Sequence, residues 1–238
     1  MTYFDKIENY DDEIPHHIAE YLLKKKTERI VSALRKYSDR ESLLYGLDLG
    51  CGTGHHLNSL NCHNTDWQII GLDYSKKQLG WTRKKYTQSE LINGSATALP
   101  FEDRKFDFVY AINSLHHLES KQDQQNAFEE VHRILKVRGL FIIHEMNTTN
   151  PLVFIFMRYI FPKLRSIDKG DEIWLTKKQV EIFTADKFSM LNTDYFTMIP
   201  FSFPQSLLPF FIRVDGIFDH SPLSYFGAHV MYIYQKME

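Results

Sequence analysis

The sequence predicts an α/β fold built on a doubly wound, mostly parallel sheet. Between residues 43 and 146, five short apolar runs alternate with stretches in which apolar residues recur at helical spacing. Strands that alternate with helices of this size form right-handed βαβ units, and ligands bind such sheets at the carboxyl ends of the strands. The 238 residues, 43% of them hydrophobic, are enough for one core, so we expect a single domain.

Each element has its own signal along the chain. Residues 14–37 place isoleucine, leucine and valine at near-helical spacing between lysines and glutamates, which predicts an amphipathic helix or helix pair. Ser75 and Gln78 have the spacing of a capping box and predict a helix between the second and third strands; residues 121–135 predict another. The apolar runs predict strands over residues 43–49, 68–74, 90–96, 106–113 and 139–146.

The stretch LDLGCGTGHH, residues 47–56, predicts a ligand site. It places three glycines behind an apolar strand, and the helix that follows from His55 has free N–H groups that favour an anionic or polar ligand group. A dinucleotide site would have the spacing G-x-G-x-x-G/A, but His55 stands where the last small residue should be. Dinucleotide binding, and with it a nicotinamide-dependent oxidoreductase, is therefore the weaker alternative.

The pattern acid-x-Gly-x-Gly-x-Gly after an apolar strand resembles the cofactor motif of class I S-adenosylmethionine-dependent methyltransferases, a Rossmann-like family. The stretches NGSATALPFED and FDFVYAINSLHHL are similar to later motifs of that family, so the resemblance covers residues 44–147. It implies S-adenosyl-L-methionine as the cofactor, with the glycine turn under its methionine part and an acid on its ribose hydroxyls. The implied cofactor-binding residues are Asp48, Gly50, Gly52, Gly54, Asp73, Tyr74, Ser95, Ala96 and Asn113.

The chain departs from the family pattern at two places. The family has Asp where this chain has Ser95, whose hydroxyl can still accept one hydrogen bond from the adenine, while Ala96 keeps the backbone donor. The turn Val137-Arg138-Gly139 keeps only one glycine of the family's Lys-Pro-Gly-Gly. These departures leave a cofactor-binding protein without catalytic activity as a further alternative.

The resemblance also implies a seven-stranded sheet that an antiparallel C-terminal hairpin closes, with strands near residues 189–199 and 227–236. Two insertions interrupt this part of the sheet, residues 148–188 before the hairpin and residues 198–218 between its strands. The apolar, aromatic stretch of the first is too short to span a bilayer. In the second, Pro200, Pro204 and Pro209 are expected to prevent a long regular helix. We expect the insertions either to roof an apolar pocket or to pack as a cap without a lipid role. The single domain 1–238 is thus divided into N-terminal helices (1–42), a cofactor-binding core (43–147), a helical lid insertion (148–188) and closing strands with an apolar insertion (189–238).

Methyl transfer needs few catalytic groups, because the cofactor supplies the reactivity and the protein supplies alignment and dryness. A hydroxyl acceptor must lose a proton, and His116 and His117 are the candidate catalytic bases, with a place in the cofactor wall or core as the alternative. His144 and Glu145, at the end of the fifth strand, are expected either to touch the substrate or to lie in solvent. We expect methylation of a hydroxyl on a small molecule or glycan, with a carbon of a quinone-like or lipid acceptor as the alternative.

Composition and charge restrict the partners. The formal net charge of -2 includes no block of lysine or arginine that could track a phosphate backbone, so no nucleic-acid substrate is expected. The sequence has no secretory signal and no apolar run of membrane-spanning length, which predicts a cytoplasmic enzyme without a transmembrane segment. Cys51 and Cys62 are expected to be reduced, and no metal site is expected because adjacent histidine pairs lack the i, i+4 spacing of helical ligands.

Overall fold

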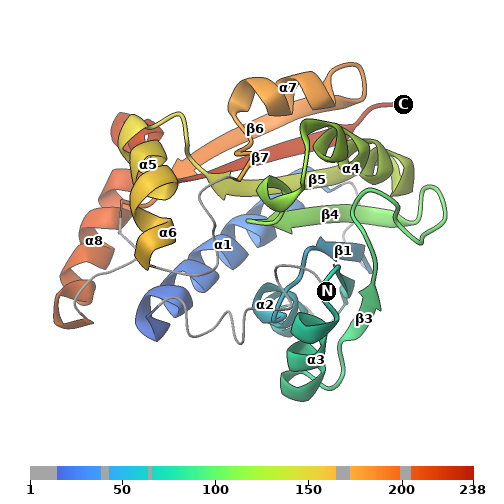
Figure 1. Ribbon diagram of the computed structural model, residues 1–238, viewed down its shortest axis with the longest axis horizontal. Helices are drawn as coiled ribbons and strands as arrows, with labels where there is room; N and C mark the ends of the chain where they lie inside the picture. Colours follow the sequence, from blue (N-terminus) through green and yellow to red (C-terminus); the bar gives the residue numbers. More distant parts are fainter. Residues whose placement is uncertain (1–14, 39–42, 64–65, 165–171, 199–204) are drawn as a thin grey trace.

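The computed structural model describes residues 15–38, 43–63, 66–164, 172–198 and 205–238 (Figure 1). Seven strands of these residues form one sheet in the order β3-β2-β1-β4-β5-β7-β6. Neighbouring strands from β3 to β5 are parallel, whereas β7 is antiparallel to both β5 and β6. The doubly wound sheet with an antiparallel closing hairpin is therefore confirmed. The strands are β1 (Tyr45–Leu49), β2 (Gln68–Asp73), β3 (Glu90–Asn93), β4 (Phe106–Ile112), β5 (Leu135–Met146), β6 (Phe188–Phe196) and β7 (His229–Lys236).

Side chains cap several helices at the residues that the sequence indicates. At the start of α3 the Ser75 hydroxyl accepts the N–H of Gln78 (3.3 Å), and at α7 Thr176 and Gln179 form both hydrogen bonds of a capping box. Residues 151–164 are helical throughout, with a π-helical turn (Phe156–Ile160) between α5 and α6. The helices are α1 (His16–Tyr37), α2 (His55–His63), α3 (Lys76–Lys85), α4 (Lys121–Ile134), α5 (Pro151–Ile155), α6 (Phe161–Leu164), α7 (Lys177–Thr184) and α8 (Leu208–Asp219), with 3-10 turns η2 (Leu115–His117), η4 (Gln205–Leu207) and η5 (Pro222–Phe226).

Helices bury both faces of the sheet. On one face α4 and α7 contribute Phe128 and Val180 to a cluster of buried apolar side chains, and on the other α1 and α2 contribute Ile30 and Leu57. The strand order reverses between β1 and β4, which carry the sheet outward in opposite directions. Ligands of such sheets bind at this reversal, outside the carboxyl ends of the two strands.

Some local expectations differ from the structure. The fifth strand begins at Leu135, before the expected residue 139, and Arg138 within it has a φ of 64° in the left-handed region. The described part of residues 14–37 forms one helix, α1, and no second one. Pro209 does not prevent a regular helix, because it lies in the first turn of α8, where no hydrogen bond requires its missing N–H. Pro200 and Pro204 lie outside the described residues.

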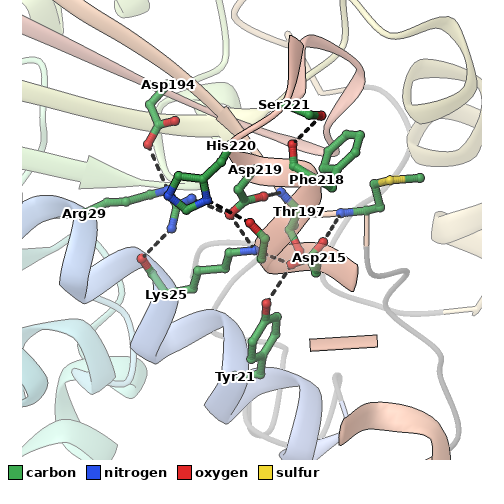
Figure 2. Close-up of polar contacts among 12 residues, drawn as sticks. Tyr21, Lys25, Arg29, Asp194, Thr197, Asp215, Phe218, Asp219, His220 and Ser221 are labelled. Carbon is green, nitrogen blue, oxygen red and sulfur yellow. Dashed lines mark hydrogen bonds and ion pairs between the residues drawn. The ribbon is translucent and has the colours of Figure 1, made fainter. Parts of the chain in front are cut away.

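Buried ion pairs join α1 to α8, and a partly buried one joins it to β6 (Figure 2). Lys25 of α1 contacts the carboxylates of Asp215 and Asp219 in α8. Arg29, one turn further along α1, donates to Asp219 (2.6 Å) and to Asp194 in β6 (2.9 Å). The hydroxyls of Tyr21 and Thr197 also donate to Asp215. The N-terminal helix and the second apolar insertion are thereby held together on one face of the sheet.

Candidate functional site

The three glycines of the turn after β1 have positive φ angles, 82° at Gly50, 52° at Gly52 and 78° at Gly54. A Cβ atom at Gly50 would lie 2.5 Å from Cβ of Ser114, and one at Gly54 would lie 2.3 Å from Cγ2 of Thr82. These two positions require glycine because their neighbours leave no room. A Cβ at Gly52 would have nothing within 4 Å. Gly52 is thus the position at which a ligand can approach the bare backbone closely.

Asp73, at the end of β2, ties the glycine turn to the start of α3. Its Oδ2 accepts the N–H of Gly52 (2.8 Å), and its Oδ1 accepts the N–H of Ser75 (2.8 Å). The hydroxyl of Thr82 in α3 donates to the carbonyl oxygen of Gly52 (2.8 Å). The carboxylate that the family resemblance assigns to the ribose hydroxyls is therefore held beside the turn by two backbone donors.

Asp48, within β1, is a buried acid directly before the turn. Its side chain is 2% exposed. Burial raises the pKa of Asp48 to about 8, an effect that the nearby Asp73 carboxylate reinforces and the Tyr110 hydroxyl weakens. Asp48 is therefore mostly protonated at neutral pH, and a cationic group arriving beside it would favour its ionised form.

The loop after β3 is the expected adenine side of the site. The Ser95 Oγ lies 2.8 Å from Oγ1 of Thr97 and accepts the Thr97 N–H (3.2 Å), so this hydroxyl is engaged within its own turn. Tyr74 is 63% exposed and lies beside the end of β2. The Nδ2 of Asn93 donates to two carbonyl oxygens there (2.9 Å each). Sequence reasoning did not single out Asn93, which holds the ends of β2 and β3 together.

Asn113 and Ala96 complete the predicted cofactor residues. The backbone of Asn113 has a φ of 49°, which asparagine tolerates, and its N–H donates to the carbonyl oxygen of His144 (3.0 Å). The side-chain Oδ1 of Asn113 is buried without a hydrogen-bond partner among the described residues. Ser114, the next residue, donates to the Leu49 carbonyl oxygen at the turn (2.8 Å), and Ala96 packs against the core. An unpaired buried acceptor next to the residue that contacts the glycine turn fits the polar cofactor that the resemblance implies.

His116 and His117 lie in η2, directly after β4. The Nδ1 of His116 lies 2.5 Å from Oε2 of Glu145, and the two side chains are 3% and 1% exposed. The ring of Trp174 stacks on that of His116 (4.4 Å between centroids, 25°), and the His117 ring lies 4.0 Å away. If Glu145 is the acceptor in this contact, the tautomer of His116 that donates carries its proton on Nδ1.

Lys26, His144 and His229 are further buried polar groups near the end of β5. Lys26 of α1 is buried; burial lowers the pKa of Lys26 to about 8, and the Glu145 carboxylate opposes this effect. His144 and His229 form a buried pair (Nε2 to Nδ1 3.1 Å), and burial lowers the pKa of each well below its usual range, which keeps both rings neutral. Since His144 and Glu145 are both buried, the expected alternative of a strand end in solvent is wrong.

The wall around Trp174 is apolar. Met146 at the end of β5 and Met157 and Phe161 from residues 151–164 form one buried cluster with it. The first insertion therefore packs directly against the aromatic ring that covers His116. Sequence reasoning missed Trp174 because no periodic pattern surrounds it. Lys26 was missed because the lysine run 24–26 is typical of a solvated helix face.

The described part of the chain contains neither a metal-binding cluster nor a membrane-spanning helix. No group of three or more histidine, cysteine, aspartate or glutamate side chains there could hold a metal ion. Helices long and apolar enough to cross a membrane are also absent from the described ranges. Cys51 is buried, Cys62 is exposed, and both are free thiols.

Comparisons with known proteins agree with this geometry. The family described as a methyltransferase domain matches residues 47–143, from the glycine turn to β5. A demethylmenaquinone methyltransferase of Thermotoga maritima is 29% identical over 229 residues, which cover 92% of this chain and 93% of that protein.

More distant matches show the same core. The 24-methylenesterol C-methyltransferase 2 of Oryza sativa subsp. japonica is 26% identical over 147 residues, which span 59% of this chain but only 39% of that protein. The crystal structure of a putative sarcosine dimethylglycine methyltransferase from Galdieria sulphuraria superposes with a TM-score of 0.61 at 18% identity, covering 90% of this chain and 86% of that one. At this sequence identity the superposition supports a shared fold and nothing more.

Proposed function

Because this chain belongs to the class I S-adenosylmethionine-dependent methyltransferases, we propose that it methylates a carbon atom of an apolar, quinone-like or lipid acceptor. The relatives in Thermotoga maritima and Oryza sativa are named for a demethylmenaquinone and a sterol, and the second name specifies C-methylation. These names favour a carbon acceptor over the hydroxyl of a small molecule or glycan, which stays the alternative.

The observation that carries the proposal is the buried His116–Glu145 pair beneath Trp174. Apolar side chains, Met157 and Phe161 among them, pack around Trp174. An apolar acceptor gains from such surroundings because its surface leaves water there, and a few polar groups suffice to fix its orientation. The pair supplies such polar groups beside the loop that contacts the glycine turn.

The chemistry of a hydroxylated ring suits this pair. Loss of the O–H proton raises the electron density at the neighbouring ring carbon and makes that carbon a nucleophile. Glu145 holds His116 with Nδ1 as donor, and an imidazole in this tautomer accepts a proton at Nε2. S-adenosylmethionine supplies an activated methyl group when bound. Held at Gly52 and Asp73, the cofactor would supply this methyl group to the ring carbon, and the hydrogen that the carbon exchanges for it would leave as a proton, so one proton would be released per methyl group.

The first experiment tests the cofactor. Thermal unfolding is measured with S-adenosylhomocysteine, S-adenosylmethionine and NADH in separate samples. A ligand at about 100 times its Kd adds ~2.7 kcal/mol to the free energy of unfolding, which raises the midpoint of a chain of this size by several degrees. We expect a shift with the two adenosyl compounds alone. A shift with NADH alone would contradict the assignment of the cofactor.

The second experiment tests the acceptor. The enzyme is incubated with methyl-labelled S-adenosylmethionine and, separately, a prenylated naphthoquinol, a sterol and a glycan, and NMR of the product shows whether the label is bonded to carbon or oxygen. We expect a carbon-bound label on the quinol or the sterol; an oxygen-bound label would overturn the proposal. Glu145→Gln should lower kcat about 100-fold or more without changing S-adenosylhomocysteine affinity. The exposed Glu119 supplies the control Glu119→Gln, which should keep the parent kcat.

A further inference from the structure

One end of the molecule exposes an unusually large apolar surface. This surface, which we call the docking face, is formed by the helical residues 151–164, by α8 and by η5. Eight of its large apolar side chains are more than half exposed: Leu152, Tyr159, Leu164, Phe210, Ile217, Leu223, Tyr225 and Phe226. Single exposed apolar residues are ordinary, but a contiguous group of this kind marks an interaction surface.

The two helical segments of the docking face bury some apolar side chains and expose others on their outer sides. In residues 151–164, Met157 and Phe161 are buried, while Leu152 and Tyr159 are exposed. In α8 the outer stripe recurs at i, i+4 and i+7. It consists of Phe210, Val214 and Ile217, which are 65%, 40% and 74% exposed. An apolar stripe on the outer side of a helix is normally covered, by protein or by lipid.

The segments adjoin one another. Asn150, which caps α5, donates through Nδ2 to the carbonyl oxygen of Phe226 in η5 (2.6 Å), and Asn147 donates to that of Tyr225 (3.0 Å). Because η5 follows α8 directly, these contacts join the first insertion to the second. Figure 1 shows α5, α6 and α8 together at one end of the sheet.

On the docking face, cations lie on the outer side and acids on the side that faces α1. The cations on the described residues of its two helical segments are Arg158, Lys163 and Arg213, and the last two are exposed. The acids there, Asp215 and Asp219, point toward α1, where they pair with its lysine and arginine (Figure 2). The outer surface of the docking face is therefore apolar and cationic. Two copies related by a twofold axis would bring these cations together, which disfavours self-association through it.

We propose that the docking face binds the surface of an anionic membrane, with its apolar side chains in the boundary between headgroups and acyl chains and Lys163 and Arg213 at the anionic headgroups. Amphipathic helices with this combination lie in the plane of the interface and do not span it. The inner side of the face leads to the candidate site, because Phe161 packs with Trp174, which stacks on His116. Membrane binding goes beyond the proposed function and does not depend on which acceptor is methylated.

Vesicle flotation of the full chain tests the proposal, with vesicles of phosphatidylcholine alone and of equimolar phosphatidylcholine and phosphatidylglycerol. We expect stronger binding to the anionic vesicles. The double variant Phe210→Ser/Ile217→Ser should lower that binding at least tenfold. Ile182→Ser removes an equally apolar side chain, 60% exposed, from α7 and should leave binding unchanged. Lys163→Gln and Arg213→Gln should each weaken binding to anionic vesicles about fivefold and leave binding to neutral vesicles unchanged.

Several outcomes would overturn the proposal. These are no binding to either vesicle, equal losses in Ile182→Ser and the double variant, or a dimer in light scattering that Phe210→Ser disrupts. Circular dichroism checks that each variant is folded. The thermal shift with S-adenosylhomocysteine, measured without vesicles, separates the two proposals, because it reports the cofactor site alone. A variant that loses vesicle binding but keeps that shift locates the defect on the docking face.

Discussion

Replacing Asp48 by asparagine should change how the stability of the protein depends on pH. Burial raises the pKa of Asp48 from its ordinary value of 3.8 to about 8. Between these two values the unfolded chain has lost the proton of this carboxyl group and the folded chain keeps it. The folded state is therefore stabilised by this group only at low pH, and that advantage is lost as the pH rises toward 8.

The magnitude follows from the width of the interval. Each pH unit inside it is worth about 1.4 kcal/mol, so Asp48 alone should remove ~2.7 kcal/mol of stability between pH 5 and pH 7. For a chain of this size 1 kcal/mol shifts the unfolding midpoint by roughly 2–4 °C, which gives about 5–11 °C. The neutral amide that Asp48→Asn introduces does not titrate, so the variant should gain this amount over the parent across the same interval.

The assay is thermal unfolding of parent and variant at several pH values from 5 to 8. The difference between their midpoints is the quantity to follow, because any constant effect of the amide and the titration of His144 and His229 cancel in it. Glu119→Gln, which exchanges an exposed carboxylate for an amide, is the matched control for the substitution itself. If the Asp48→Asn difference does not change with pH, the buried carboxyl group does not hold its proton and the reasoning fails.

Three further substitutions test other parts of the structure. Gly52→Ala has no steric clash but a φ of 52°, so it should cost about 1 kcal/mol of stability and weaken S-adenosylhomocysteine binding at least tenfold; parent-like affinity in a binding titration would argue against the open cofactor position. Arg138→Gly should relieve a φ of 64° and raise stability by about 1 kcal/mol in urea unfolding with an unchanged m-value, and a lower midpoint would contradict this. Asp215→Asn leaves Lys25 with Asp219 alone and should cost about 2–3 kcal/mol in the same assay, whereas parent stability would show that the network contributes nothing.

The strands and the glycine turn could be predicted because their signals are local. Apolar runs bounded by turns define β1 to β4 within a few residues, and glycine spacing identifies the turn whose three positive φ angles the structure confirms. The start of β5 could not be predicted, because Leu135 joins the strand through its pairing with Phe106 of β4, a contact that no local pattern indicates. The regular helix α8 was wrongly excluded, since a proline in a first turn breaks no hydrogen bond.

In the candidate site, too, local motifs could be predicted, but contacts between residues far apart in the sequence could not. His116 was identified from its place after the fourth strand, but its contact with Glu145 joins residues 29 positions apart. The burial of Lys26 depends on how α1 lies over the sheet, which a run of three lysines does not reveal. The acceptor follows neither from periodicity nor from spacing, and the relatives moved the preference from a hydroxyl to a carbon.

The ion pairs between α1 and α8 also bear on the order in which the chain can fold. Lys25 and Asp215 are 190 residues apart, and so are Arg29 and Asp219. During synthesis the first helix therefore emerges long before the carboxylates that neutralise it, and its cations stay in water until α8 has left the ribosome. Contacts of such separation are late and cooperative events in folding. Helix α1 can therefore complete its packing on the sheet only after α8 has been synthesised.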